Sequence, residues 1–141
     1  MAGNSIEFDI KVPNKTRYLS LIGKIGEDIA RELDRYGGDR DTLAYHLNLV
    51  LTEAMVNAIK HAGPNEPEKL VRIVISIISD EMTIRVYDDG QGFDINEIPP
   101  PNFDELEDRG RGIFLIRSLM DSVCYWKSHR ENVLEMKKKL I

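Results

Sequence analysis

The chain has 141 residues, of which 42% are hydrophobic and 30% are charged, and its formal net charge at pH 7 is −5. This composition excludes a disordered chain, and the acidic balance argues against direct binding to nucleic acid, which normally needs a basic surface. No apolar run approaches the roughly 20 residues that cross a membrane, and the first residues lack the basic and apolar regions of a signal peptide. We therefore expect a single cytoplasmic domain over residues 1–141, with no membrane contact. Its one cysteine, Cys124, cannot form an internal disulfide and is expected to be a buried small residue.

The first part of the chain predicts a strand followed by a helix. Ser5–Val12 alternates apolar and polar residues, which is typical of a half-buried strand. Lys15–Tyr36 carries apolar residues at helical spacing, so we expect an amphipathic helix that lies on a flat surface. Asn14 is the expected N-cap of this helix, and the pair Gly37-Gly38 is its expected stop.

The segment Leu43–Ala62 organises the rest of the chain. It predicts a long helix that is apolar nearly all round, and such a helix is usually buried. Either Asp39 or Asp41 is expected to cap its start.

Three polar side chains stand in the second half of this helix. Glu53, Asn57 and His61 follow one another at intervals of four residues, which aligns them along one side of the helix. A carboxylate and an amide among buried apolar residues are costly unless a partner meets them. Carboxylate and amide oxygens suit Mg²⁺, and a glutamate beside a phosphate can activate a hydroxyl. Judged alone, however, the pair Glu53 and Asn57 favours a structural role.

The second half of the chain predicts four strands and one helix. The strands and the helix are Leu70–Ser79, Met82–Asp88, Ile113–Asp121 (the helix), Ser122–Ser128 and Asn132–Leu140. The first two strands are close enough in sequence to form a hairpin, and the first of them is β-branched on both faces, as inner strands are. We expect a mixed, mostly antiparallel sheet covered on one face by three helices, which is an α+β two-layer sandwich.

A first glycine segment, DDGQG, follows the strand that ends at Asp88. An acid at a strand end followed by Gly90 and Gly92 gives a turn with unusual backbone freedom. The segment is explained by a tight turn alone, or by a ligand that presses against bare backbone while Asp88 accepts a hydrogen bond from it.

A second glycine segment, Gly110-Arg111-Gly112, precedes the predicted third helix. Free amides at a helix start attract phosphate, and Arg109 and Arg111 would add positive charge in a geometry that suits phosphate. A flexible hinge with solvated arginines explains this segment equally well when it is judged alone.

Together, and in this order, the three segments resemble the GHKL (Bergerat-fold) ATP-binding superfamily. The helix pattern ExxxNxxxH matches its N box, DxGxG matches its first glycine box, and GxG matches its second. Within the superfamily the chain looks most like the anti-sigma-factor serine/threonine-protein kinases, on the stretches TEAMVNAIKHA, VYDDGQGFD and GRGIFLIRSLMDSV. The resemblance implies the Bergerat ATP-binding fold, with ATP and Mg²⁺ as cofactors.

The resemblance also implies roles for the residues of the first two segments. Glu53 would be the general base that removes the proton from the attacking hydroxyl, and Asn57 would be a ligand of the Mg²⁺ that bridges the phosphates. Asp88 would accept a hydrogen bond from the adenine amino group, while Gly90 and Gly92 would shape the adenine pocket.

In the third segment, the resemblance implies that Gly110 and Gly112 form the hinge of an ATP lid and leave amides free for the phosphates. We expect Arg109 and Arg111 to contact the γ-phosphate, on the argument from charge given above. His61 is expected to pack near the site rather than to act in catalysis.

The activity implied by the resemblance is transfer of the γ-phosphoryl group of ATP to a serine or threonine of a STAS-type antagonist protein. Members of this family also bind a sigma factor and form homodimers, so we expect both properties here. The lid, at about residues 93–109, and the first helix would be partner surfaces. Two other functions stay open: a nucleotide-dependent partner-switching module without kinase activity, and the detached catalytic half of a histidine kinase. The second is disfavoured because no dimerisation helix pair with a phospho-accepting histidine is present.

Overall fold

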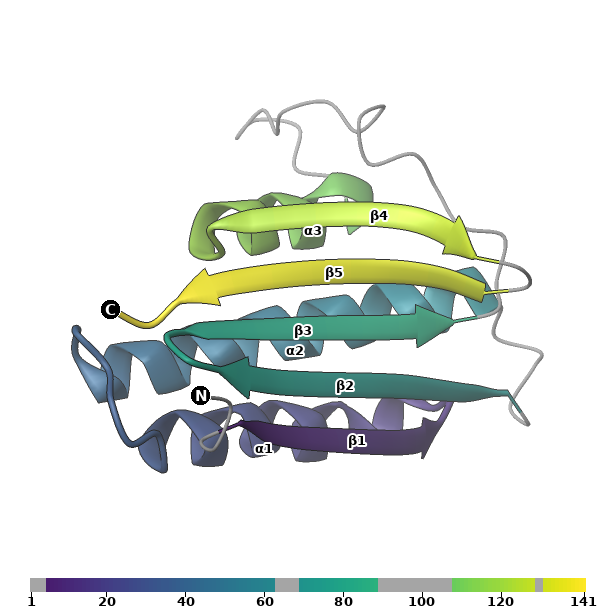
Figure 1. The fold of residues 1–141 in the computed structure, drawn as a ribbon. Coiled ribbons are helices and arrows are strands. Elements are labelled where there is room, and N and C mark those ends of the chain that lie inside the picture. The colour runs from purple at the N-terminus through teal and green to yellow at the C-terminus, as the bar shows by residue number, and fades with distance from the viewer. Residues whose placement is uncertain (1–4, 63–68, 89–107, 129–130) are drawn as a thin grey trace.

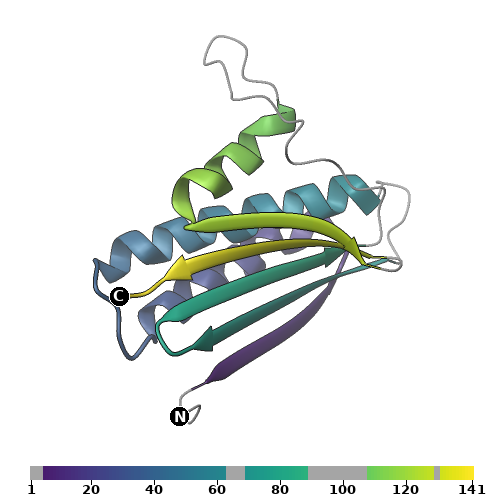
Figure 2. The same cartoon turned by 45° about the horizontal axis from the view of Figure 1, so that its top comes forward.

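The protein is an α+β two-layer sandwich, in which one sheet carries all the described helices on the same face (Figures 1 and 2). The computed structural model describes residues 5–62, 69–88, 108–128 and 131–141. Within them the sheet has five strands in the order β1-β2-β3-β5-β4, and all four pairings are antiparallel. The fold class expected from the sequence is therefore confirmed, with an antiparallel rather than a mixed sheet over the described strands.

The elements follow the predicted order closely. The strands are β1 (Ile6–Pro13), β2 (Leu70–Ile78), β3 (Glu81–Asp88), β4 (Ser122–Ser128) and β5 (Glu131–Lys139). The helices are a 3₁₀ turn η1 (Thr16–Tyr18), α1 (Leu19–Arg31), α2 (Arg40–Ala62) and α3 (Asp108–Leu119). No helix in these described ranges is long and apolar enough to span a membrane.

The core lies between the sheet and α2. In β2 the residues Val71, Ile73, Ile75 and Ile77 are buried, while those between them are only half-buried, because the helices cover a single face. The position of β2 between β1 and β3 confirms that it is an inner strand. On α2, the side chains that are fully buried include Leu43, Leu47, Val50, Leu51 and Met55. This helix is apolar nearly all round because α1, α3 and the sheet all pack against it.

The N-terminal helix is shorter than predicted and is not capped by Asn14. The backbone N–H of Asn14 donates to the carbonyl of Lys69 at 2.9 Å, which ties the end of β1 to the start of β2. The α-helix ends at Arg31, well before the glycine pair. The side chain of Arg40 donates to the carbonyls of Ala30 and Asp34, each at 3.4 Å, and so satisfies backbone acceptors that a longer helix would have used.

Of the two residues predicted to cap α2, Asp39 is the one that does so. Its Oδ2 accepts hydrogen bonds from the Thr42 hydroxyl at 2.7 Å and from the Thr42 backbone N–H at 3.3 Å. These bonds lower the pKa of the Asp39 carboxyl below its ordinary value, and the bond from the Thr42 hydroxyl has the largest effect. Asp41 instead forms an ion pair with Arg31 of α1.

The expectation that Cys124 is buried is wrong: its side chain is exposed. Cys124 lies on β4, an outer strand of the described sheet, and its neighbours Val123 and Tyr125 pack towards the core. Since successive side chains of a strand point to opposite faces, Cys124 faces away from the helices.

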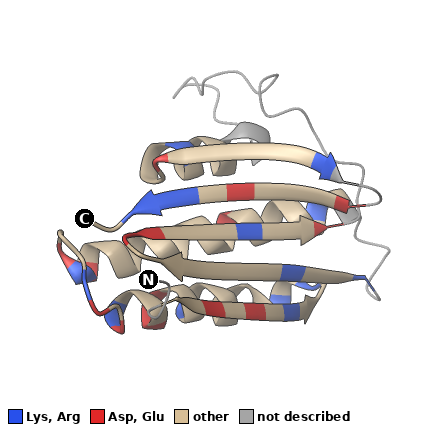
Figure 3. Cartoon of the chain, in the orientation of Figure 1, with Lys and Arg blue, Asp and Glu red and all other residues tan. Residues whose placement is uncertain are grey.

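The strands carry charged residues of both signs (Figure 3), and several of these form pairs on the face of the sheet away from the helices. Arg72 on β2 donates to both carboxylate oxygens of Asp9 on β1, at 3.0 and 2.8 Å. Arg85 on β3 donates to Glu135 on β5 at 2.7 Å. These pairs join neighbouring strands across the uncovered face.

Candidate functional site

The C-terminal half of α2 and the start of α3 bring two of the predicted segments together. Glu53 and Asn57 lie one helical turn apart on α2, and both are partly buried. Gly112 of α3 is buried against the first of them: a Cβ placed on Gly112 would lie 2.6 Å from Oε2 of Glu53. The helix motif and the second glycine motif, which are distant in sequence, therefore form one site.

The beginning of α3 differs from the prediction. The helix starts at Asp108, so Gly110, Arg111 and Gly112 lie within it and not before it. The first four N–H groups of a helix have no partner within the helix, and these now run from Asp108 to Arg111. The amide of Gly110 is among them, whereas that of Gly112 is in the second turn. The early start of the helix thus removes Gly112 from the predicted set of free amides.

Asn57 offers a polar group that the described residues leave unmatched. Its Nδ2 atom is buried and has no hydrogen-bond partner among them. A buried polar group without a partner costs about 1–3 kcal/mol, so a ligand at this position would recover that cost. Rotation of the amide by a half-turn exchanges its nitrogen and oxygen, so the same place can present an acceptor oxygen.

This arrangement fits Mg²⁺ bound with a nucleotide better than a metal held by protein alone. In the described ranges, no group of three or more His, Cys, Asp or Glu side chains could hold a metal ion. Mg²⁺ in phosphate-transfer sites usually takes one or two protein oxygens and completes its octahedron with phosphate oxygens and water. Asn57 supplies one such protein oxygen.

Asp88 ends β3 and is almost fully buried, with 5% of its surface exposed. Its Oδ1 accepts a hydrogen bond from Nδ2 of Asn132 at 2.9 Å, and its Oδ2 lies 3.5 Å from Nδ1 of His61. The His61 ring also makes an edge contact with Tyr125 of β4, with ring centroids 6.4 Å apart. His61, the third residue of the polar stripe, therefore connects α2 to the carboxylate of the first glycine motif.

Asn132 is a site residue that the sequence reasoning did not find. It faces Asp88 in the pairing of β3 with β5, and it is 1% exposed. Its position could have been found only by aligning Asp88 with the start of the last strand. The available signal was that Asn132 occupies the same face of its strand as Leu134 and Met136, two and four residues later, and that this face is buried.

Several predicted site residues lie outside the described residues. These are Gly90 and Gly92, the lid from 93 to 107, and the side chains of Arg109 and Arg111. The described part of the site thus consists of Glu53, Asn57, His61, Asp88, Gly112 and Asn132.

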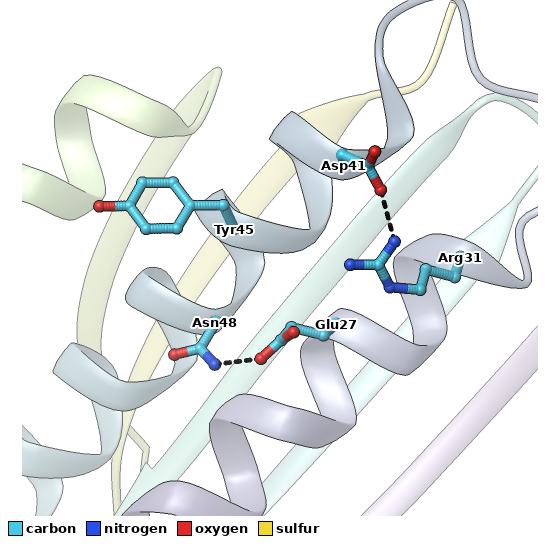
Figure 4. Close-up of a pocket in the computed structure, with 5 residues that line it drawn as sticks. All are labelled: Glu27, Arg31, Asp41, Tyr45 and Asn48. Carbon is cyan, nitrogen blue, oxygen red and sulfur yellow. Dashed lines mark hydrogen bonds and ion pairs between the residues drawn. The ribbon is translucent and has the colours of Figure 1, made fainter.

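A separate groove of about 360 Å³ lies between α1 and α2 (Figure 4). It is lined by Glu27, Arg31, Asp41, Tyr45 and Asn48. The polar groups there satisfy one another: Asn48 donates to Glu27 at 2.6 Å, and Arg31 pairs with Asp41. None of the predicted nucleotide-site residues lines it, so this groove is not the candidate site.

Comparison with known proteins agrees with this fold. A family model described as the histidine kinase-like ATPase domain matches residues 13–138. The chain therefore belongs to the histidine kinase-like ATPase family, which confirms the predicted resemblance. It is similar to the serine-protein kinase RsbW of Staphylococcus aureus, with 32% identity over 128 residues, 84% of this chain and 78% of that protein. The same protein from strain Newman matches with the same values.

A solved structure supports the fold alone. The histidine kinase domain of a blue-light activated histidine kinase from Erythrobacter litoralis EL346 matches with a TM-score of 0.53 and 20% identity. The match covers 92% of this chain and 62% of the solved chain, so the present chain spans less than two thirds of that protein.

Proposed function

We propose that this protein is an ATP-dependent serine/threonine-protein kinase that acts as an anti-sigma factor and phosphorylates a STAS-type antagonist. The observation that carries the proposal is the contact between Glu53 and Gly112, with Asn57 one turn along α2. The contact supports the proposal because it brings the Glu53 carboxylate, the proposed base, close to the start of α3. The unmatched amide of Asn57, the proposed metal ligand, lies one turn away. The similarity to a serine-protein kinase supports the same activity.

The reaction needs positioning more than covalent chemistry from the protein. The oxygen of the antagonist hydroxyl forms a bond to the γ-phosphorus of ATP, the bond from that phosphorus to the β,γ-bridging oxygen breaks, and ADP leaves. The hydroxyl proton passes to the carboxylate of Glu53. Mg²⁺, when bound, neutralises charge on the phosphates.

The other proposed residues hold the nucleotide. Asn57 provides an amide oxygen to the metal, and Asp88 accepts a hydrogen bond from the amino group of adenine. Asp88 is suited to this because an ionised carboxylate only accepts hydrogen bonds and offers about four lone-pair positions. Asn132 occupies one of them, and His61 lies beside the other oxygen. We propose that Gly90, Gly92, Gly110 and Arg111 complete the nucleotide site.

The test of the base is Glu53→Gln, which keeps the size of the side chain and removes its basicity. We expect ATP affinity within about threefold of the wild type and a loss of phosphotransfer of about 10²–10⁴-fold, the range for general-base catalysis. Calorimetry would measure ATP binding, and transfer of labelled phosphate to purified STAS-type proteins would measure activity.

The possible results separate the proposals clearly. Phosphotransfer at the wild-type rate by the glutamine variant would show that Glu53 is not the base. Wild-type protein that binds ATP and changes its partner with the nucleotide, but phosphorylates no antagonist, would indicate a binding module in place of a kinase. Absence of ATP binding by the wild type would overturn the whole proposal.

We also propose that the protein works in the cytoplasm as a homodimer that exchanges the antagonist for a sigma factor. Light scattering of the purified chain would test the dimer. Co-elution with antagonist or sigma factor in the presence of ATP or of ADP would test the exchange, and identical co-elution with both nucleotides would contradict it.

A further inference from the structure

The contact between α3 and α2 depends on the absence of a side chain at Gly112. A Cβ at this position would lie 2.6 Å from Oε2 of Glu53, whereas real Cβ atoms essentially never approach another heavy atom closer than 3.0 Å. The same Cβ would lie 3.5 Å from both Cβ and Cδ of Glu53, which is ordinary van der Waals contact. The conflict is therefore confined to the oxygen at the tip of the glutamate.

The backbone at Gly112 does not itself require glycine. The residue lies within α3, and its φ is outside the left-handed range that side chains rarely adopt. In a helix interior, alanine is favoured over glycine by about 1 kcal/mol. A requirement for glycine here would come from the space that the missing side chain leaves, not from backbone freedom.

The carboxylate of Glu53 has little else to fix its position. Among the described residues, no hydrogen bond or ion pair holds it. The bare backbone of Gly112 leaves open the space beside Oε2 of Glu53 that a Cβ would otherwise occupy.

We propose that Gly112 is a positioning residue for phosphotransfer, because its lack of a Cβ leaves the space in which the Glu53 carboxylate meets the substrate hydroxyl. This rests on the proposed role of Glu53 as the base. A glutamate tip can rotate away from an added methyl group, so the fold tolerates the change while the base moves. Proton transfer needs heavy atoms about 2.6–3.2 Å apart, and a displacement of about 1 Å can cost about 10²-fold in rate.

The first measurement is Gly112→Ala in the whole chain. We expect kcat for phosphotransfer to fall about 10–100-fold, with the KM for ATP and the Kd for ATP each within about threefold of the wild type. The matched control is Gly37→Ala, where a Cβ would meet nothing closer than 3.6 Å, and it should leave kcat, KM and Kd unchanged. Wild-type kcat in Gly112→Ala would overturn the proposal.

The second measurement separates positioning of the base from other effects of the alanine. In a Glu53→Gln background, Gly112→Ala should cause no further loss of phosphotransfer, since the base that it displaces is already absent. A further loss of the same size there, or a loss of ATP binding, would show that Gly112 acts on the nucleotide or the fold, and would overturn the proposal. Wild-type activity of Glu53→Gln alone would instead show that the proposed function of Glu53 is wrong.

A third measurement does not depend on activity. In a Glu53→Ala background the conflicting oxygen is absent, so Gly112→Ala should raise the melting temperature through the helix preference of alanine. The same substitution in the wild-type background should raise it less or lower it. Equal shifts in the two backgrounds would contradict the steric contact, and this comparison remains informative even if Gly112→Ala alone folds poorly.

Discussion

Asp88, the proposed partner of the adenine amino group, is tightly constrained by its contacts within the protein. Both of its oxygens face a nitrogen of the protein, Nδ2 of Asn132 and Nδ1 of His61. Replacement by asparagine would turn one of these acceptor oxygens into an NH₂ group, which only donates. That NH₂ group would face a nitrogen of the protein or the amino group of adenine. We expect Asp88→Asn to weaken ATP binding at least about tenfold, because a hydrogen bond to a charged group is worth about 1.5–3 kcal/mol. Calorimetry with MgATP would measure the loss.

The control for this prediction is Asp9→Asn on the uncovered sheet face, which removes a carboxylate far from the site and should leave ATP binding unchanged. Equal affinities for all three proteins would show that adenine is recognised elsewhere.

The residues of one helix could be assigned to the site from sequence, whereas residues on different strands could not. Glu53 and Asn57 share a side of α2 because of a helical period that is visible in the sequence. Asn132 meets Asp88 only through the register of β3 and β5, which depends on how the strands pair and not on spacing. The sequence likewise could not show that the Glu53 tip lies against Gly112, because that contact depends on how α3 packs on α2.

At the scale of elements, the ends of helices were the hardest feature to predict. The end of α1 at Arg31 depends on Arg40, which belongs to the next helix and binds carbonyls at the end of the first. The early start of α3 at Asp108 leaves Gly112 inside a helix in which glycine is locally unfavourable. Helix periodicity and strand alternation, by contrast, predicted the existence, type and order of every described α-helix and strand.

The cap of α2 predicts how stability depends on pH. The pKa of Asp39 is lowered in the folded protein, chiefly by the Thr42 hydroxyl, below its ordinary value of 3.8. Because the pKa of Asp39 is lower in the folded than in the unfolded protein, its ionised carboxylate stabilises the fold fully at pH values above the unfolded pKa. This stabilisation is lost as the pH falls through the folded pKa. We expect the melting temperature of the wild type to fall, relative to that of Asp39→Asn, as the pH drops from about 4 to about 2.

Asparagine is the suitable comparison because it caps helices about as well as aspartate but does not titrate. Melting curves of the two proteins, measured side by side from neutral to acidic pH, provide the test. A constant difference in melting temperature across that range would show that the Asp39 carboxylate does not contribute in the way that its contacts indicate.

At the scale of the whole molecule, nucleotide binding should stabilise the fold, because the site joins α2, α3, β3 and β5. A ligand at about 100 times its Kd adds about 2.7 kcal/mol to the free energy of unfolding. We expect MgATP to raise the melting temperature of the wild type by several degrees, ATP with a chelator to raise it less, and MgATP to raise that of Asp88→Asn less than that of the wild type. Equal shifts with and without the metal would contradict the role of Asn57.

The place of β5 in the sheet has a consequence for synthesis of the protein. β5 follows the other four strands in sequence, yet it lies between β3 and β4. A nascent chain that has not yet produced Glu131–Lys139 contains the neighbouring strands β1, β2 and β3. It lacks the strand that links β4 to them, and it lacks the Asn132 that faces Asp88. The end of the candidate site at Asp88 is therefore completed only after this last strand has emerged from the ribosome.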